Sequence, residues 1–437
     1  MKIAILRSKQ NNPFKAFFDG LLLFLYIYEF NFVHFGLPTF ITSRRIAIAI
    51  LALLVLKRSI LPGSSKLHVE IPQKEHTGSI IKISLLQCFL LIYVLFIYLF
   101  IGKGTGEMVS NSIIRLLFFG IVPIFLFYVY FDNLDQFMRA VLFATLLQAI
   151  IIIICLASSS FQTRLDRIFA FESKYVALHR QEYAGGLACI TAPGALKFSM
   201  GLIACAYFLL KKKRSLCVAL YLFLSLMATL VARTGVFVAG TGLIVILLYF
   251  VIEERNFHIF WIVLSIAIIV GIAIMLLSYF NLWSFLANRL SRFEKLSGGL
   301  YEGFFDNYLH EAHNHIPGLS KKTIIGTGIT SGESGNGVYI NADGGFLRLY
   351  VAFGLPLCVA FYTHFVYHVV RQIRLTKNKF AFYALIFFSI TFLIAEIKEY
   401  TLYSQYMVCL FFAIVTLAGK QVNQNSFAFA EEFDEKL

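Results

Sequence analysis

The sequence predicts an all-α fold, that of a polytopic integral membrane protein with about twelve transmembrane helices. Of its 437 residues, 59% are hydrophobic and only 14% are charged, whereas about 25% of the residues in a soluble domain are charged. The apolar residues also fall in blocks of about twenty, the length that crosses a hydrocarbon core. Long unbroken apolar runs such as 260–280 lack the alternation of barrel strands, which indicates that the spans are helices.

The apolar blocks divide the chain into successive parts. Residues 1–280 are expected to form a transmembrane bundle of nine spans, with an outer loop near 158–192. Residues 281–343 are expected to form a large extracytoplasmic loop, 344–419 three C-terminal spans and 420–437 a polar tail. In chain order, the expected spans lie near 16–38, 46–62, 83–102, 112–131, 138–157, 193–210, 215–232, 234–252, 257–280, 344–369, 380–396 and 402–419.

Basic residues between the spans predict the orientation, because short cytoplasmic loops are enriched in Lys and Arg. Residues 57–58, 211–214 and 371–379 carry such clusters, and all three fall on the cytoplasmic side when the N-terminus is inside. The even number of spans then places both termini in the cytoplasm. No cleavable signal peptide is expected, because the first apolar block follows several Lys and Arg residues and lacks a small-residue cleavage site.

The net charge of +14 favours anionic ligands at the membrane over nucleic acid, because the basic residues lie between apolar blocks. Under the predicted topology the cytoplasmic side has 14 Lys and 7 Arg, and the outer side has 7 Lys and 10 Arg. Arginine has a planar fork of donors suited to phosphate. The excess of arginine outside therefore predicts a phosphate-bearing ligand there. The outer arginines are Arg44, Arg45, Arg115, Arg164, Arg167, Arg180, Arg233, Arg289, Arg292 and Arg348.

Three of these arginines have a functional and a structural interpretation. Arg233 interrupts an apolar region, and a charge at membrane depth costs roughly 2.5 kcal/mol or more, which favours a polar cavity or a ligand. The alternative is that two spans meet there and Arg233 snorkels at the turn. Arg44 and Arg45 are expected either to anchor the outer end of a span or to bind a lipid headgroup.

The large loop holds further candidates. Its segment 289–303 is expected to form an amphipathic surface helix, whose Arg289 and Arg292 contact either lipid phosphates or the phosphate of a substrate. Asp343 stands where the loop enters the tenth span, and a carboxylate in such a partly dry place can act as a general base or cap the helix. Arg348 follows further along the helix, within reach of Asp343 or of a ligand.

No metal ion or cofactor is expected. The histidine-rich segment 310–315 lacks HExxH spacing, and the Gly-rich segment after it lacks Walker spacing. Six of the seven cysteines fall in apolar blocks, which argues against a disulfide framework. Asp19, Glu29 and Glu396 lie in or beside apolar blocks and are candidate polar linings.

An ordered set of motifs runs through the second half of the chain. Arg233-Thr234-Gly235 opens a span, and ten residues separate Arg292 from Gly303 in the large loop. IIGTGITSG lies near the end of this loop, which closes in NADGGFLRLYVAFGLPL. Over about 180–360, this order resembles the superfamily of O-antigen polymerases and O-antigen ligases.

The resemblance implies a membrane glycosyltransferase of the bacterial inner membrane that builds lipopolysaccharide O-antigen, capsule or a related polysaccharide. The growing glycan leaves undecaprenyl pyrophosphate and joins the nonreducing end of a lipid-linked repeat unit, without metal or cofactor. Arg180, Arg233 and Arg292 would stabilise the developing charge, and Asp343 would serve as general base. Substrate contacts are further expected from Arg164, Arg167, Arg289, Arg348 and Gly303.

Two alternatives stay open. One is a ligase of the same superfamily, although ligases have a His-Asn pair where this chain has Asn341-Ala342-Asp343. The other is a flippase or exporter of lipid-linked oligosaccharide, for which charges at mid-membrane and gating loops on both faces would be typical. The expected partners are the lipid-linked oligosaccharide and the bilayer, with a chain-length regulator and a flippase as further candidates.

Overall fold

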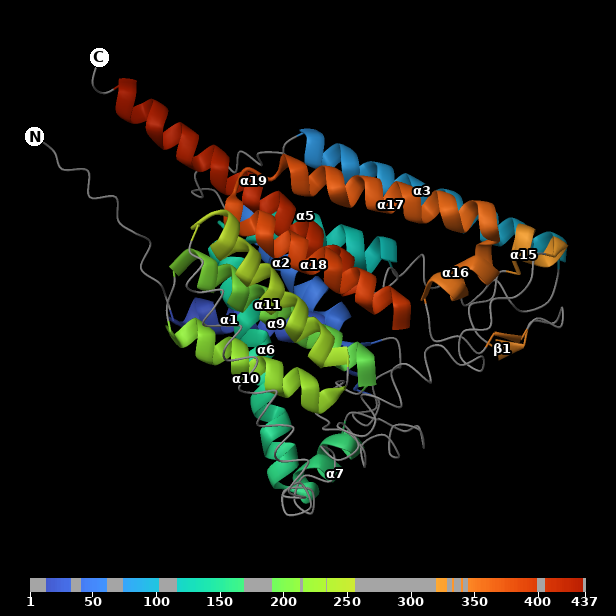
Figure 1. Cartoon of the computed structure of the whole chain (residues 1–437), viewed down its shortest axis with the longest axis horizontal. Helices are drawn as coiled ribbons and strands as arrows, with labels where there is room; N and C mark the ends of the chain where they lie inside the picture. The colour runs from blue at the N-terminus through green and yellow to red at the C-terminus, as the bar shows by residue number, and fades with distance from the viewer. Residues whose placement is uncertain are drawn as a thin grey trace, which may run out of the picture.

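The structure of the chain is a computed structural model (Figure 1). The residues that it describes are 13–32, 41–60, 74–101, 116–168, 191–212, 215–232, 234–255, 320–327, 332–333, 339–340, 345–398 and 405–434.

Helices dominate the described residues. The first half contains α1 (Pro13–Ile27), α2 (Ser43–Ile60), α3 (Lys74–Ile101), the π-helix η2 (Leu116–Ile121), α5 (Val122–Tyr130), α6 (Leu134–Ala157), α7 (Ser159–Ile168), α9 (Thr191–Lys212), α10 (Ser215–Val231) and α11 (Thr234–Ile252). The second half contains α15 (Lys321–Ile325), α16 (Gly345–Phe353), α17 (Leu355–Leu375), α18 (Lys379–Lys398) and α19 (Gln405–Asp434). Two short antiparallel strands, β1 (Gly332–Glu333) and β2 (Tyr339–Ile340), pair within the segment expected to be the large loop.

The expected helical fold is confirmed, and it contains candidate membrane spans. Five helices of the described residues are long and apolar enough to cross a membrane, and each coincides with an expected span. The count of about twelve spans and the large extracytoplasmic loop stay predictions, and the expected ninth span lies outside the described residues. The five helices contain the apolar stretches His76–Ile97, Leu134–Cys155, Pro193–Lys212, Thr234–Ile252 and Lys379–Ile397.

Three expected elements have different bounds in the structure. Helix α1 ends at Ile27, well before residue 38, and the chain then turns so that Asn31 pairs with Thr42. The expected tenth span consists of two helices, α16 and α17, because Gly354 between them has a φ of 79° and Pro follows two residues later. The expected polar tail is helical as far as Asp434, as a continuation of α19.

Helix α9 forms the centre of the bundle. It packs against α6, α10, α11 and α18. Of the residues in its most apolar stretch, 89% are buried inside the protein. Small residues along it, including Ala204 and Ala206, let neighbouring helices approach closely. At Gly201 a Cβ atom would lie 2.5 Å from the Cγ2 atom of Thr145 on α6. The approach of α6 and α9 therefore requires glycine at this position.

Helices α3 and α17 lie side by side along one edge of the bundle, with α15 and α16 at one end of the pair (Figure 1). Only 29% of the residues in the most apolar stretch of α3 are buried inside the protein. Large apolar side chains such as Leu85, Ile92 and Leu99 are exposed along it. In a membrane, this surface would face lipid.

Ion pairs and hydrogen bonds gather lysines from several helices at one end of the bundle. Lys15 on α1 contacts Asp132 at 3.2 Å, and Lys211 on α9 contacts Asp135 at 2.7 Å. Lys420 on α19 donates hydrogen bonds to two backbone carbonyls at the end of α5. We call this the lysine end, defined by Lys15, Lys211 and Lys420. These charged groups lie at helix ends and are partly exposed to water, so the free-energy cost of desolvating them is small.

Candidate functional site

Most of the predicted site residues lie outside the described residues. They are Arg180, Arg233, Arg289, Arg292, Gly303 and Asp343, together with the histidine-rich segment 310–315. Arg164 and Arg167 belong to α7, and Arg348 belongs to α16. The described part of the candidate site therefore consists of these three arginines and the helices that carry them.

The end of the expected loop closes onto α16, at the start of the expected tenth span. The backbone N–H of Thr327 donates to the carbonyl oxygen of Val351 at 2.8 Å, and the Thr327 hydroxyl donates to the same oxygen at 3.1 Å. Because Thr327 is buried, with 2% of its surface exposed, both bonds are shielded from water. We call this arrangement the loop corner, defined as α15, Gly326, Thr327, α16 and Gly354.

Two glycines allow the two segments of the loop corner to touch. Gly326 has a φ of 95°, and a Cβ atom there would lie 2.6 Å from the carbonyl oxygen of Ala352. Gly354 has a φ of 79°, and a Cβ atom there would collide with the carbonyl oxygen of Ile324. Any larger residue would be strained both by its backbone conformation and by contact with the opposite segment. The two glycines belong to the motifs IIGTGITSG and NADGGFLRLYVAFGLPL.

Short polar contacts fix the loop corner to its neighbours. The Tyr93 hydroxyl on α3 donates to the carbonyl oxygen of Ile325 at 2.5 Å, which joins α3 to the corner. Ser320 and Thr323 cap α15 reciprocally: the Ser320 hydroxyl accepts from the Thr323 N–H at 3.2 Å, and the Thr323 hydroxyl accepts from the Ser320 N–H at 2.8 Å. The corner is therefore held by α3 as well as by α16.

The described arginines of the predicted site lie at two separate places. Arg348 is half-buried in the second turn of α16, within the loop corner. Arg164 is exposed on α7, an amphipathic helix that begins where α6 ends at Ser158. Helix α7 packs against α6 and lies apart from α16 (Figure 1). The structure therefore places Arg348 within the corner and leaves Arg164 apart from it.

A buried carboxylate lies beside the loop corner. Glu396, near the end of α18, is 7% exposed, and its Oε1 atom accepts a hydrogen bond from the Tyr362 hydroxyl of α17 at 2.5 Å. One turn earlier on α17, the Sγ atom of Cys358 donates to the carbonyl oxygen of Phe346 on α16 at 3.8 Å. Sequence reasoning identified Glu396 only as a polar lining and missed Tyr362, because the antiparallel pairing of α17 and α18 brings the two together across 34 residues.

Arg44 has a structural role that corrects the expectation of a surface anchor or lipid ligand. Its side chain is 6% exposed, and its Nη1 atom lies 2.8 Å from the Oε2 atom of Glu29. The Nε–H group donates to the carbonyl oxygen of Tyr26 at 2.9 Å, and the guanidinium lies over the Tyr26 and Tyr406 rings. Thr42 donates to the second Glu29 oxygen at 2.8 Å. These contacts close the turn between α1 and α2.

No family model, curated protein or solved structure matches this chain. The functional assignment therefore depends on the residues themselves. The motifs that resemble the O-antigen polymerase and ligase superfamily include the two glycines and the threonine that build the loop corner.

Proposed function

We propose that the chain is a polysaccharide polymerase of the bacterial plasma membrane. It transfers a growing glycan from undecaprenyl pyrophosphate to the nonreducing end of a lipid-linked repeat unit, at the outer face. In this proposal the chain has about twelve spans and both termini in the cytoplasm. The product is an O-antigen, a capsule or another exported polysaccharide.

The loop corner is the observation that carries the proposal. In the sequence, the motif NADGGFLRLYVAFGLPL contains the proposed base Asp343, and the motif IIGTGITSG precedes it in the expected loop. The hydrogen bonds from Thr327 to Val351 join these two motifs, and both glycines in the contact have backbone conformations that favour glycine. Asp343 precedes α16 by two residues in the sequence, so the corner would hold the segment that carries it. This supports a site at this end of the bundle.

Polar contacts between helices support the proposed topology. Lys15, Asp132, Asp135 and Lys211, which are all expected at the cytoplasmic side, contact one another in pairs. Arg44, which is expected at the outer side, pairs with Glu29 just beyond the other end of α1, roughly 20 Å from Lys15 at 1.5 Å of rise per helical residue.

The proposed chemistry needs cations, a base and two lipid-linked substrates. The acceptor hydroxyl oxygen bonds to the anomeric carbon of the donor glycan, and the bond from that carbon to the pyrophosphate oxygen breaks. Undecaprenyl pyrophosphate leaves with the electron pair, and Asp343 takes the hydroxyl proton. Arg180, Arg233 and Arg292 stabilise the charge on the leaving pyrophosphate. The pyrophosphate bond supplies the driving force, so the proposal includes no cofactor.

The remaining site residues bind substrate in this proposal. Arg348 in the loop corner and Arg164 on α7 contact phosphate or glycan from different sides of the outer face, together with Arg167, Arg289 and Gly303. A flippase must deliver the lipid-linked repeat to the outer face, and a chain-length regulator would limit the length of the product.

In vitro polymerisation tests the proposal. Purified protein in detergent would receive undecaprenyl-pyrophosphate-linked repeat units from the native host, with chelator and without ATP. Wild type would be compared with Arg292→Ala, Arg233→Ala and Asp343→Asn, each checked for folding by gel filtration. We expect a ladder of products from the wild type and none from the three variants.

Each other outcome has a defined meaning. A ladder that survives Asp343→Asn would retain the polymerase and reject Asp343 as the base. No ladder from folded wild-type protein with the authentic repeat would refute the polymerase. Transfer of a finished polymer to a lipid or protein acceptor would then indicate a ligase, and movement of the repeat across vesicle membranes would indicate a flippase.

A further inference from the structure

We propose that the contact between α3 and α17 contains a water site, at which buried water bridges Gln87 of α3 with His364 and His368 of α17. Within the described residues, the Oε1 atom of Gln87, the Nε2 atom of His364 and the Nδ1 atom of His368 are buried and form no hydrogen bond. Gln87 and His368 are each 1% exposed, and His364 is half-buried. The site lies apart from the loop corner and does not depend on the proposed function.

The two helices pack against each other in opposite directions. Near the start of α3, the Ser79 hydroxyl accepts a hydrogen bond at 2.6 Å from the side chain of Gln372, which is near the end of α17. Further along α3, the Tyr93 hydroxyl donates to the carbonyl oxygen of Ile325, which lies against Gly354 at the start of α17. The bond between Ser79 and Gln372 therefore sets the register of an antiparallel pair.

This register brings the three buried polar side chains to the same stretch of the contact. From the bond between Ser79 and Gln372, Gln87 is eight residues further along α3 (79 to 87), and His364 is eight residues back along α17 (372 to 364). Both positions are about 12 Å from that bond, at about 1.5 Å of rise per residue. The ring of His368, one turn from His364, has its centroid 4.5 Å from the His364 centroid.

Water is the ligand that suits these three groups. The Gln87 side-chain oxygen only accepts hydrogen bonds, whereas each histidine nitrogen donates or accepts according to its tautomer. A water molecule does both, and buried waters typically form about three hydrogen bonds to polar groups that have no other partner. Such bonds restore what a buried polar atom loses when it leaves bulk water. A metal cation is disfavoured, because Lys82 and Arg371 place positive charge near His368.

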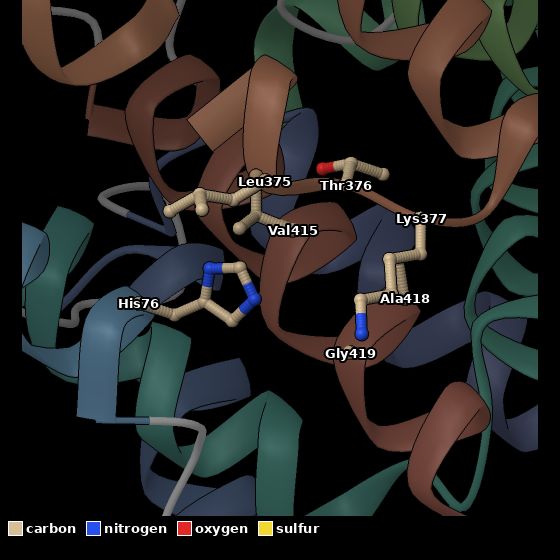
Figure 2. Close-up of a pocket in the computed structure, with 7 residues that line it drawn as sticks. All are labelled: His76, Leu375, Thr376, Lys377, Val415, Ala418 and Gly419. Carbon is tan, nitrogen blue, oxygen red and sulfur yellow. The ribbon is translucent and has the colours of Figure 1, made fainter. Parts of the chain in front are cut away.

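Polar groups connect the site to a small pocket at one end of the helix pair. The pocket lies between the start of α3, the link from α17 to α18 and α19, and its lining includes His76 and Thr376 (Figure 2). Its cavity volume of about 10 Å³ is close to the minimum that holds one water molecule. The His76 ring is hydrogen-bonded to Gln372, which is one helical turn from His368. Water therefore has a polar route from the pocket into the contact between α3 and α17.

Radiolytic footprinting of the full chain in detergent, in water enriched in ¹⁸O, tests the proposal. Hydroxyl radicals formed from a bound water oxidise the side chains beside it, and mass spectrometry locates the ¹⁸O. Wild type is compared with Gln87→Leu, which removes the acceptor but keeps most of the bulk. Ser84→Ala is the matched control, because the Ser84 hydroxyl donates to the Ile80 carbonyl within α3. Phe361 of α17, a ring that is 1% exposed, reports the background oxidation of a buried side chain.

Each oxidation rate is expressed relative to that of the same residue in the unfolded chain. We expect His364 and His368 to take up ¹⁸O several-fold faster than Phe361 in wild type and in Ser84→Ala, and to fall to the rate of Phe361 in Gln87→Leu. Equal rates for the histidines and Phe361 in wild type would overturn the proposal, and this comparison needs no variant. Unchanged uptake in folded Gln87→Leu would also overturn it. Uptake that appears only after a chelator is added would identify a metal cation in place of water and overturn it equally.

Discussion

The ion pair between Glu29 and Arg44 provides the sharpest test of how the bundle is held together. We consider Glu29→Gln, which keeps the shape of the side chain and its hydrogen bond with Thr42 but removes the negative charge. Arg44 keeps its positive charge and is only 6% exposed. The substitution therefore leaves a buried cation without its counter-charge.

The magnitude follows from the geometry of the pair. At 2.8 Å and an effective dielectric constant of about 20, the attraction is roughly 6 kcal/mol. Desolvation of the two groups offsets much of this gain in the native protein, but removal of one partner leaves the cost for the other. Breaking a buried pair costs about 3–5 kcal/mol. The Glu29 side chain is 33% exposed and glutamine still accepts a hydrogen bond, so we expect about 2–4 kcal/mol.

Equilibrium unfolding in mixed micelles measures this cost as a change in the free energy of unfolding. Four proteins are needed: wild type, Glu29→Gln, Arg44→Met and the double variant. The double variant removes both charges, so its loss of stability should be smaller than the sum of the two single losses by more than 1 kcal/mol. Arg45→Met serves as the matched control, because it removes the charge of the adjacent arginine, which is only half-buried.

Two results would refute the reasoning. Additive losses in the double variant would show that the two charges act independently. A loss below about 1 kcal/mol for Glu29→Gln would show that Arg44 reaches water or another counter-charge when Glu29 is neutral.

Three further predictions concern the loop corner, the buried carboxylate and the topology. Gly354→Ala should cost about 1–3 kcal/mol of stability and reduce polymerisation. Gly78→Ala, at a position on α3 with open space around it, is the control and should be neutral or stabilising in the same assays. Equal effects of the two substitutions would argue against a strained loop corner. Tyr362→Phe removes the hydroxyl bonded to Glu396 and should cost about 1–3 kcal/mol, so wild-type stability would count against the burial of that pair. Arg164→Cys should react with a membrane-impermeant maleimide in intact spheroplasts above the background of the native cysteines, and labelling only after permeabilisation would invert the proposed topology.

The amino-acid sequence by itself was enough to predict the helical membrane fold. Burial in lipid requires long apolar stretches, and this requirement is visible in composition and block length without any knowledge of packing. The apolar stretches Leu134–Cys155, Pro193–Lys212 and Thr234–Ile252 coincide with expected spans for this reason. The sequence also contains the glycines of the loop corner, although it does not show that they meet.

Only the tertiary structure decided which polar residues meet and which helices break. Hydropathy predicted one span over 344–369, but the positive φ of Gly354 divides it into α16 and α17, and the contact with Ile324 leaves no room for a side chain there. Hydropathy likewise could not distinguish a surface Arg44 from a buried one, because its burial depends on Glu29 and Tyr406 from other segments. Apolar character is a property of each segment, whereas the pairing of charges and the fit of glycines are properties of segments in contact. The sequence therefore determines which helices are long and apolar enough to cross a membrane, and the packing determines which polar groups meet.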